Sequence, residues 1–157
     1  MNSIINIIVF SDSHGNTEPM NEAVLRFKPD MIIHLGDHAW DADCFTHRET
    51  SVRHVRGNCD YGSAVRETDT VVLPQGIKVV MTHGHLYSVK TGLQPILNMG
   101  RVAGADILLF GHTHRALCER WGDMLVMNPG TAGVGKGLTC GLLHINGIEF
   151  KGEIVSL

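Results

Sequence analysis

The residues of this chain that can do chemistry form short clusters of histidine, aspartate and asparagine. The clusters occupy residues 12–16, 36–38, 57–60, 82–85 and 111–114. Each cluster follows a short apolar run, which is where a strand would end. In open α/β sheets such loops converge on one shared edge, so residues far apart in the sequence can meet there. The clusters therefore predict one site with enough imidazole and oxygen ligands for two metal ions.

The ligand types indicate which metals this site would prefer. Carboxylate and amide oxygens with neutral imidazoles, and no required thiolate, suit manganese, nickel, iron, cobalt or zinc. An aspartate that bridges two sites turns them into one dinuclear centre, and two ions about 3.5–4 Å apart stabilise an in-line displacement at phosphorus. We therefore expect a cofactor of two divalent metal ions, with manganese as the first choice, and hydrolysis of a phosphate ester.

The same clusters resemble calcineurin-like metallophosphoesterases, and within them the small single-domain phosphodiesterases of bacteria and archaea. The motifs that carry the resemblance are Asp12-x-His14-Gly15-Asn16, Gly36-Asp37, Gly57-Asn58-Cys59-Asp60, Thr82-His83-Gly84-His85, Gly111-His112-Thr113-His114 and Asn128-Pro129-Gly130-Thr131. They follow the order of the family and span most of the chain. The resemblance implies a four-layer α/β/β/α sandwich of two mixed sheets flanked by helices.

The resemblance also implies a role for each residue of the site. One metal would be bound by Asp12, His14 and His114, the other by Asn58, His83 and His112, and Asp37 would bridge them. The catalytic residues would be Asp37, Asn58 and His83, and the substrate would contact Asn58, Cys59 and His85. The implied reaction is attack of a metal-bridging hydroxide on a small phosphoester.

Cys59 is the one departure from the larger members of the family that this chain resembles. Many of them have Gly-Asn-His-Asp where this chain has Gly57-Asn58-Cys59-Asp60. Their histidine protonates the leaving group or holds the phosphate. A thiol with a pKa of about 8.5 is a weak hydrogen-bond donor. The small-phosphodiesterase branch shares this cysteine, so it marks a subfamily rather than a loss of activity. Because the thiol is a poor acid, we expect a preference for good leaving groups, or another acid such as His85 or His38.

Length, charge and cysteine content limit the number of domains, the partners and the cellular location that we expect. The 157 residues suffice for one domain, 1–157, with its own core. A net charge of -3 gives no basic field for a nucleic-acid polymer, and no apolar run reaches the length of a membrane span. The four cysteines form no C-x-x-C pair, so we expect reduced thiols and a cytoplasmic location. The oligomeric state stays open, and a homo-oligomer is one possibility.

Apolar runs and turn residues predict the order of helices and strands. Expected strands are 4–10, 31–35, 51–56, 70–73, 77–81, 106–110, 116–120, 124–127, 138–145 and 148–155, with helices from Asn16 or Thr17 to Lys28 and over 92–103. Residues 38–50 are the least regular segment, and His47 within them has no assigned role. His34, inside an apolar run, is expected to be a core histidine. Because β-α units come first and antiparallel hairpins follow, two sheets packed face to face are expected.

A phosphate-binding loop is the first alternative, because Gly130, Gly135 and Lys136 nearly match its spacing. Gly137 stands where that motif requires serine or threonine, and a strand rather than a helix is expected next. We therefore reject a nucleotide-triphosphatase and expect Lys136 to be a surface charge.

Two other functions remain as rivals. The same fold resembles a membrane-trafficking subunit that binds partner proteins, so a catalytically silent scaffold is one of them. A scaffold has no reason to retain a complete ligand set. A protein-serine/threonine phosphatase is disfavoured by the short chain and by the missing histidine beside Asn58.

Overall fold

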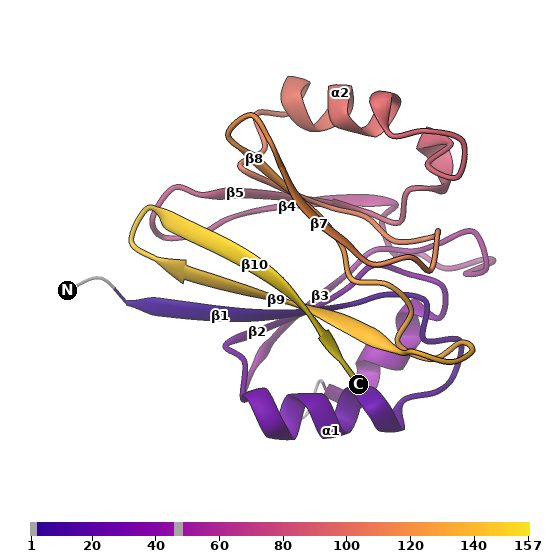
Figure 1. Ribbon diagram of the computed structural model, residues 1–157. Helices are drawn as coiled ribbons and strands as arrows, with labels where there is room; N and C mark the ends of the chain where they lie inside the picture. Colours follow the sequence, from indigo (N-terminus) through magenta and orange to yellow (C-terminus); the bar gives the residue numbers. More distant parts are fainter. Residues whose placement is uncertain (1–2, 46–48) are drawn as a thin grey trace.

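Two five-stranded sheets pack face to face between two helices in the computed structural model, which describes residues 3–45 and 49–157 (Figure 1). His47 lies outside the described residues. The layers follow the order helix, sheet, sheet, helix, so the predicted four-layer sandwich of mixed sheets is confirmed. Within the described residues, no helix is long and apolar enough to cross a membrane.

The first sheet has the strand order β10-β9-β1-β2-β3. Its strands are β1 (Ile4–Phe10), β2 (Met31–His34), β3 (Ser51–His54), β9 (Thr139–Asn146) and β10 (Glu149–Ser156). Strands β1, β2 and β3 run parallel, whereas β9 is antiparallel to both β1 and β10. The carboxyl ends of the three parallel strands therefore lie at one edge.

The second sheet has the order β4-β5-β6-β8-β7. Its strands are β4 (Thr68–Val72), β5 (Lys78–Thr82), β6 (Ile107–Leu109), β7 (Leu117–Trp121) and β8 (Met124–Asn128). Strands β5, β6 and β8 are parallel, and β4 and β7 are antiparallel partners on the two sides. This sheet also delivers three parallel carboxyl ends to one edge.

Helices cover the outer face of each sheet. Helix α1 (Glu18–Phe27) packs on the first sheet and α2 (Gln94–Val102) on the second (Figure 1). Each has a proline in its first turn, where the missing N–H is tolerated. Helix α1 ends at Lys28, whose φ of 46° is left-handed and stops the helix before Pro29.

The apolar runs are continuous because both faces of the central strands are covered. Ile7 and Val9 of β1 lie between the two sheets, whereas Ile8 and Phe10 lie under α1. Successive side chains of a strand point to opposite faces, so a strand buried on both sides needs apolar residues throughout. Three apolar layers result, one between the sheets and one beneath each helix.

The predicted strands and long helices are present with ends shifted by one or two residues, but two short 3-10 helices were missed. They are η1 (Ala39–Phe45), in the segment expected to be irregular, and η2 (His85–Tyr87). In η1 the buried apolar side chains recur every third residue, at Ala39, Ala42 and Phe45. Three residues is the period of a 3-10 helix, so this spacing in the sequence could have predicted η1. The segment after Gly130 leads into strand β9, as expected.

Candidate metal centre

The predicted ligands lie on loops that leave the parallel strands of both sheets. The loop after β1 carries Asp12 and His14, and the loop after β2 carries Asp37. Across the interface, His83 follows β5, and the loop after β6 carries His112 and His114. The two sheets thus supply their ligands to one shared edge.

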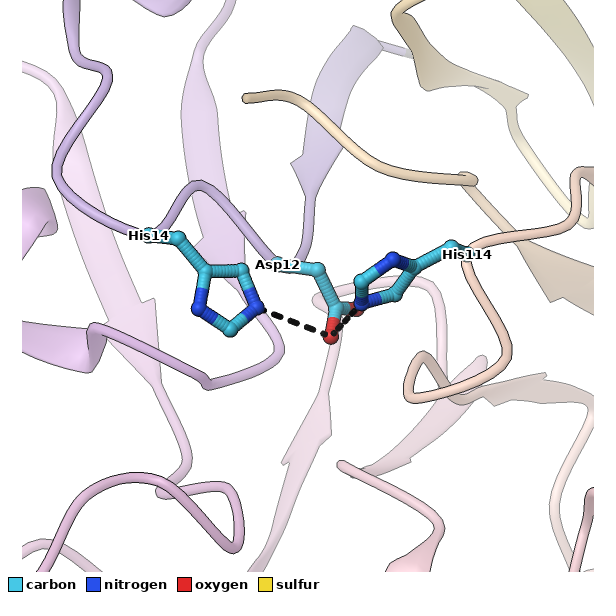
Figure 2. Close-up of side chains that lie close together, drawn as sticks. All are labelled: Asp12, His14 and His114. Atoms are coloured by element: carbon cyan, nitrogen blue, oxygen red, sulfur yellow. Dashed lines mark hydrogen bonds and ion pairs between the residues drawn. The ribbon is translucent and has the colours of Figure 1, made fainter. Parts of the chain in front are cut away.

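One carboxylate oxygen of Asp12 is fixed by hydrogen bonds, and the other faces imidazoles. Its Oδ2 accepts hydrogen bonds from the Ser11 hydroxyl and from the His112 backbone N–H, the latter at 3.1 Å. Its Oδ1 lies 3.1 Å from Nε2 of His114 and 3.9 Å from Nε2 of His14 (Figure 2). The carboxylate is fully buried, so this free oxygen has a defined direction.

Asp37 has the same arrangement. Its Oδ1 accepts the backbone N–H of Cys59 at 2.9 Å, and its Oδ2 lies 3.6 Å from Nε2 of His14 and 3.4 Å from Nε2 of His83. Burial raises the pKa of Asp37, but the hydrogen bond and charge of His83 outweigh burial and place the pKa well below its usual range. The carboxylate is therefore ionised, with one oxygen between imidazoles of the two sheets.

The tautomer of His83 is fixed by the backbone. Its Nδ1 lies 2.8 Å from the Leu35 carbonyl oxygen, which can only accept, so Nδ1 carries the proton. The lone pair of a neutral ring then lies on Nε2, which faces Asp37, Asp12 at 3.8 Å and Nδ1 of His112 at 3.2 Å. Beside two carboxylates, Nε2 of His83 needs a positive charge, which either a proton or a bound metal ion can supply. Without a metal, burial lowers the pKa of His83, yet the nearby aspartates raise it overall.

Three groups of ligand atoms, each lying within 4.8 Å of one another, are found among the described residues. They are Asp12 with His14 and His114, Asp37 with His83 and His112, and His14 with Asp37 and Cys59. The first group contains the three residues predicted for one metal. The second contains His83 and His112 of the other predicted set together with Asp37, which also takes part in the third. Its position between the sets is the one expected of a bridge.

Asn58 is the predicted ligand with the most exposed side chain. It is exposed, and its Nδ2 lies 3.6 Å from Sγ of Cys59. Burial and the Asp37 charge raise the pKa of Cys59, so the thiol keeps its proton. The His85 ring lies 5.5 Å from that of His83, and burial and the His83 charge lower its pKa. His85 Nδ1 is buried without a hydrogen-bond partner in the described structure.

The backbone at the ligands is strained. Eight non-glycine residues of the described chain have positive φ, and five are predicted metal ligands: Asp12 (55°), His14 (47°), Asp37 (56°), His112 (69°) and His114 (60°). Such conformations cost roughly 1–3 kcal/mol each and persist only where the surroundings enforce them. The concentration of strain at one edge marks it as a functional site.

Asp60 is one of the groups that enforce this backbone. Its Oδ1 accepts the N–H groups of His38 and Ala39, and its Oδ2 accepts those of Asp37 and Gly57, at distances of 2.7–3.1 Å. The sequence left open whether Asp60 orients a ligand or only forms a turn. Its four bonds join the loops after β2 and β3, and so position Asp37.

A second buried network, which the sequence did not reveal, supports the loop after β1. Gly36 N–H donates to Nδ1 of His34 at 3.1 Å, so Nε2 carries the proton and donates to the Ser13 hydroxyl at 2.8 Å. Ser13 in turn donates to Asp41 at 2.6 Å, and Asp41 also accepts the Gly15 N–H at 2.8 Å. His34 is a buried core histidine, as predicted, but the network around it joins the loop after β1, the loop after β2 and η1, which meet only in the fold.

Comparison with known proteins decides the family. Residues 5–147 match the calcineurin-like phosphoesterase superfamily domain. The chain belongs to this family. It is 33% identical to the probable metallophosphoesterase YsnB of Bacillus subtilis (strain 168), over 81% of this chain and 75% of the relative. It is 27% identical to the phosphodiesterase YfcE of Escherichia coli (strain K12), over 85% of this chain and 83% of YfcE.

Solved structures support the same fold. A predicted phosphoesterase from Streptococcus pneumoniae TIGR4 superposes with a TM-score of 0.83 at 28% identity, covering 98% of this chain and 90% of the other. Vps29 from Entamoeba histolytica, solved with zinc, superposes with a TM-score of 0.76 at 20% identity, covering 97% and 99%. The second likeness is one of fold alone.

Proposed function

We propose that this chain is a phosphodiesterase that hydrolyses a small phosphoester with two divalent metal ions. The observation that carries the proposal is the direction of Nε2 of His83, which the Leu35 contact fixes and which faces two buried carboxylates. His14 adds a second indication, because its Nε2 is buried without a hydrogen-bond partner while facing Asp12 and Asp37. The donor atoms therefore fit cations.

The ligand assignment follows the two groups of side chains. Asp12, His14 and His114 would hold one ion, and His83 and His112 the other. Asp37 would bridge them through Oδ2, the oxygen that no backbone group holds. Asn58 would complete the second set with its amide oxygen. Manganese is our first choice because oxygen and imidazole ligands suit it.

Bound divalent ions would supply Lewis acidity, which makes a nucleophile from water and neutralises charge on the phosphoryl oxygens. The protein supplies orientation. Backbone N–H groups orient the carboxylates of Asp12 and Asp37, and the Leu35 carbonyl holds His83 in the tautomer that can bind metal. All of these contacts are made before substrate arrives, so little reorganisation accompanies the reaction.

Asn58, Cys59 and His85 are proposed to contact the substrate. A cavity of about 290 Å³ is lined by Asn58 and His85 together with Arg56 and Tyr61. The protonated thiol of Cys59 can donate only weakly, and the lowered pKa of His85 favours its neutral ring, so neither supplies a proton readily at neutral pH. We therefore propose a preference for diesters with good leaving groups, in keeping with the name of the relative YfcE.

A silent scaffold is the rival function, and metal binding alone does not separate the two because a Vps29 structure was solved with zinc. Turnover does separate them. Manganese-loaded protein should hydrolyse bis(4-nitrophenyl) phosphate, and Asp37→Ala should reduce kcat on the order of 10³-fold because it removes the bridging ligand. Lys136→Ala, a change at an exposed loop residue, is the control and should leave kcat unchanged. A folded, metal-loaded protein without turnover would favour the scaffold.

Two further expectations stay predictions: a single domain over 1–157 and a cytoplasmic location. The oligomeric state stays open, with a homo-oligomer as one possibility.

A further inference from the structure

A second cavity lies beside the metal centre, on the side of α2, and the proposed function does not use it. Its volume is about 450 Å³, within the range of about 300–1,000 Å³ that holds small molecules. Val89, Leu93, Phe110 and Leu117 give it an apolar surface, and Lys90 and Arg115 add two positive charges. We call it the Lys90–Arg115 pocket.

The pocket adjoins the ligands directly. Thr113, which lines it, stands between His112 and His114 in the sequence, and Arg115 follows His114. A substrate with its phosphorus at the metal centre would therefore have this cavity within reach of one ester substituent.

The two cations have no anionic partner in the part of the chain that the structure describes. Neither Lys90 nor Arg115 forms a side-chain ion pair there. By contrast, Arg56 in the cavity on the other side of the centre is paired with Glu67 at 2.7 Å. Exposed cations alone are common, but here two lie over an apolar surface beside a reaction centre, in a chain whose net charge is -3.

We propose that the Lys90–Arg115 pocket binds one substituent of the diester substrate, and that this substituent has an apolar body and a negative charge. The apolar body would cover Phe110 and Leu93, and the charge, a carboxylate or a second phosphate, would pair with Lys90 and Arg115. The proposal rests on the proposed function, because it places the scissile phosphate at the metal centre.

The test compares matched diesters with the manganese-loaded protein. Phenyl 4-nitrophenyl phosphate is the reference diester, because its phenyl substituent is uncharged. Two other diesters carry a carboxylate or a phosphate on the phenyl ring. A hydrogen bond to a charged group is worth about 1.5–3 kcal/mol, so the wild type should prefer at least one charged diester by about tenfold or more in kcat/KM. The arm that shows the preference identifies the anion.

Variants assign the preference to the pocket. Lys90→Gln and Arg115→Gln should each lower the ratio of kcat/KM for the diester with a charged substituent to kcat/KM for the reference diester by about fivefold or more. Lys151→Gln, at an exposed residue of β10 away from the site, should leave the ratio unchanged. Equal ratios in the wild type and both pocket variants would overturn the proposal.

Failure of the proposed function gives another result than failure of the pocket proposal, because the reference diester would then not be hydrolysed either. In that case calorimetry with non-hydrolysable phosphonates, one bearing the carboxylate and one not, measures the same preference without turnover. A preference for the charged phosphonate that Arg115→Gln abolishes would support the pocket. Equal affinities would refute it.

Discussion

At the scale of single residues, the site depends on hydrogen bonds that occupy one atom of each ligand and leave another free. Asp12 and Asp37 each give one oxygen to a backbone N–H, and His83 gives Nδ1 to Leu35. The free atoms all face a common centre. Removing one of these bonds would therefore misdirect a ligand without changing its chemistry.

Cys59 allows the clearest test at this scale. Because burial and Asp37 raise its pKa, we expect the thiol to stay protonated and to have no nucleophilic role. We expect Cys59→Ser to change kcat/KM less than about threefold. Cys59→His introduces a better acid, so it should favour poor leaving groups, which need protonation, more than good ones.

The measurement is kcat/KM over a series of diesters with leaving groups of increasing pKa, for the wild type and both Cys59 variants. Metal content is determined for each, so that loss of metal is not mistaken for loss of acid catalysis. A folded, metal-loaded Cys59→Ser protein that is inactive on every substrate would show that the thiol is essential.

At the scale of elements, the loops after the parallel strands approach one another so closely that a side chain at Gly57 has no room. A Cβ there would overlap Oδ1 of Asp37, the oxygen that Cys59 holds. We expect Gly57→Ala to displace this carboxylate and to lower kcat by more than about tenfold.

Gly92→Ala is the matched control for this change, because a Cβ at Gly92 meets no atom within 4 Å and its φ is not left-handed. Thermal unfolding and metal content of both variants would accompany the kinetics. Equal kcat in the two variants would mean that the contact between the two loops does not position Asp37.

The elements themselves were readable from the sequence to the extent that they depend on local pattern. Apolar runs covered on both faces identified strands such as β1 (Ile4–Phe10), and Pro19 lies in the first turn of α1, where the sequence places the start of that helix. The antiparallel pairing of β9 with β1 was not readable, because it joins segments more than a hundred residues apart. Such pairing is selected by the whole core rather than by a local signal.

The same distinction holds for the site. Ligand types and motif order predicted the groups around Asp12 and Asp37, since these residues directly follow strands. The contacts of Ser13, His34 and Asp41 were not predicted, because they form only when the loop after β1, the loop after β2 and η1 meet. The exposed position of the Asn58 side chain likewise depends on local geometry that the motif does not encode.

At the scale of the whole molecule, His34 links stability to pH. Burial lowers its pKa from 6.5 to about 4, so between these values the unfolded chain binds more protons than the folded one. The stabilising contribution of neutral His34 is therefore complete above pH 6.5 and is lost as the pH falls to about 4. The shift corresponds to about 3 kcal/mol.

His34→Gln removes this titration while retaining a donor and an acceptor. Urea unfolding of the metal-free proteins between pH 4 and pH 7 should show that the wild type loses about 3 kcal/mol more than the variant. The metal ligands titrate in both proteins and cancel in the comparison. Parallel pH profiles would mean that folding does not depress the pKa of His34.

The central claim is that two metal ions bound by one chain hydrolyse a phosphodiester. The most direct measurement is a titration of metal-free protein with manganese, in which bound metal per chain and hydrolysis of bis(4-nitrophenyl) phosphate are followed together. We expect binding to saturate at two ions, with activity reaching its plateau as the second is bound. Saturation at one ion with full activity, or full hydrolysis in excess chelator, would contradict the claim.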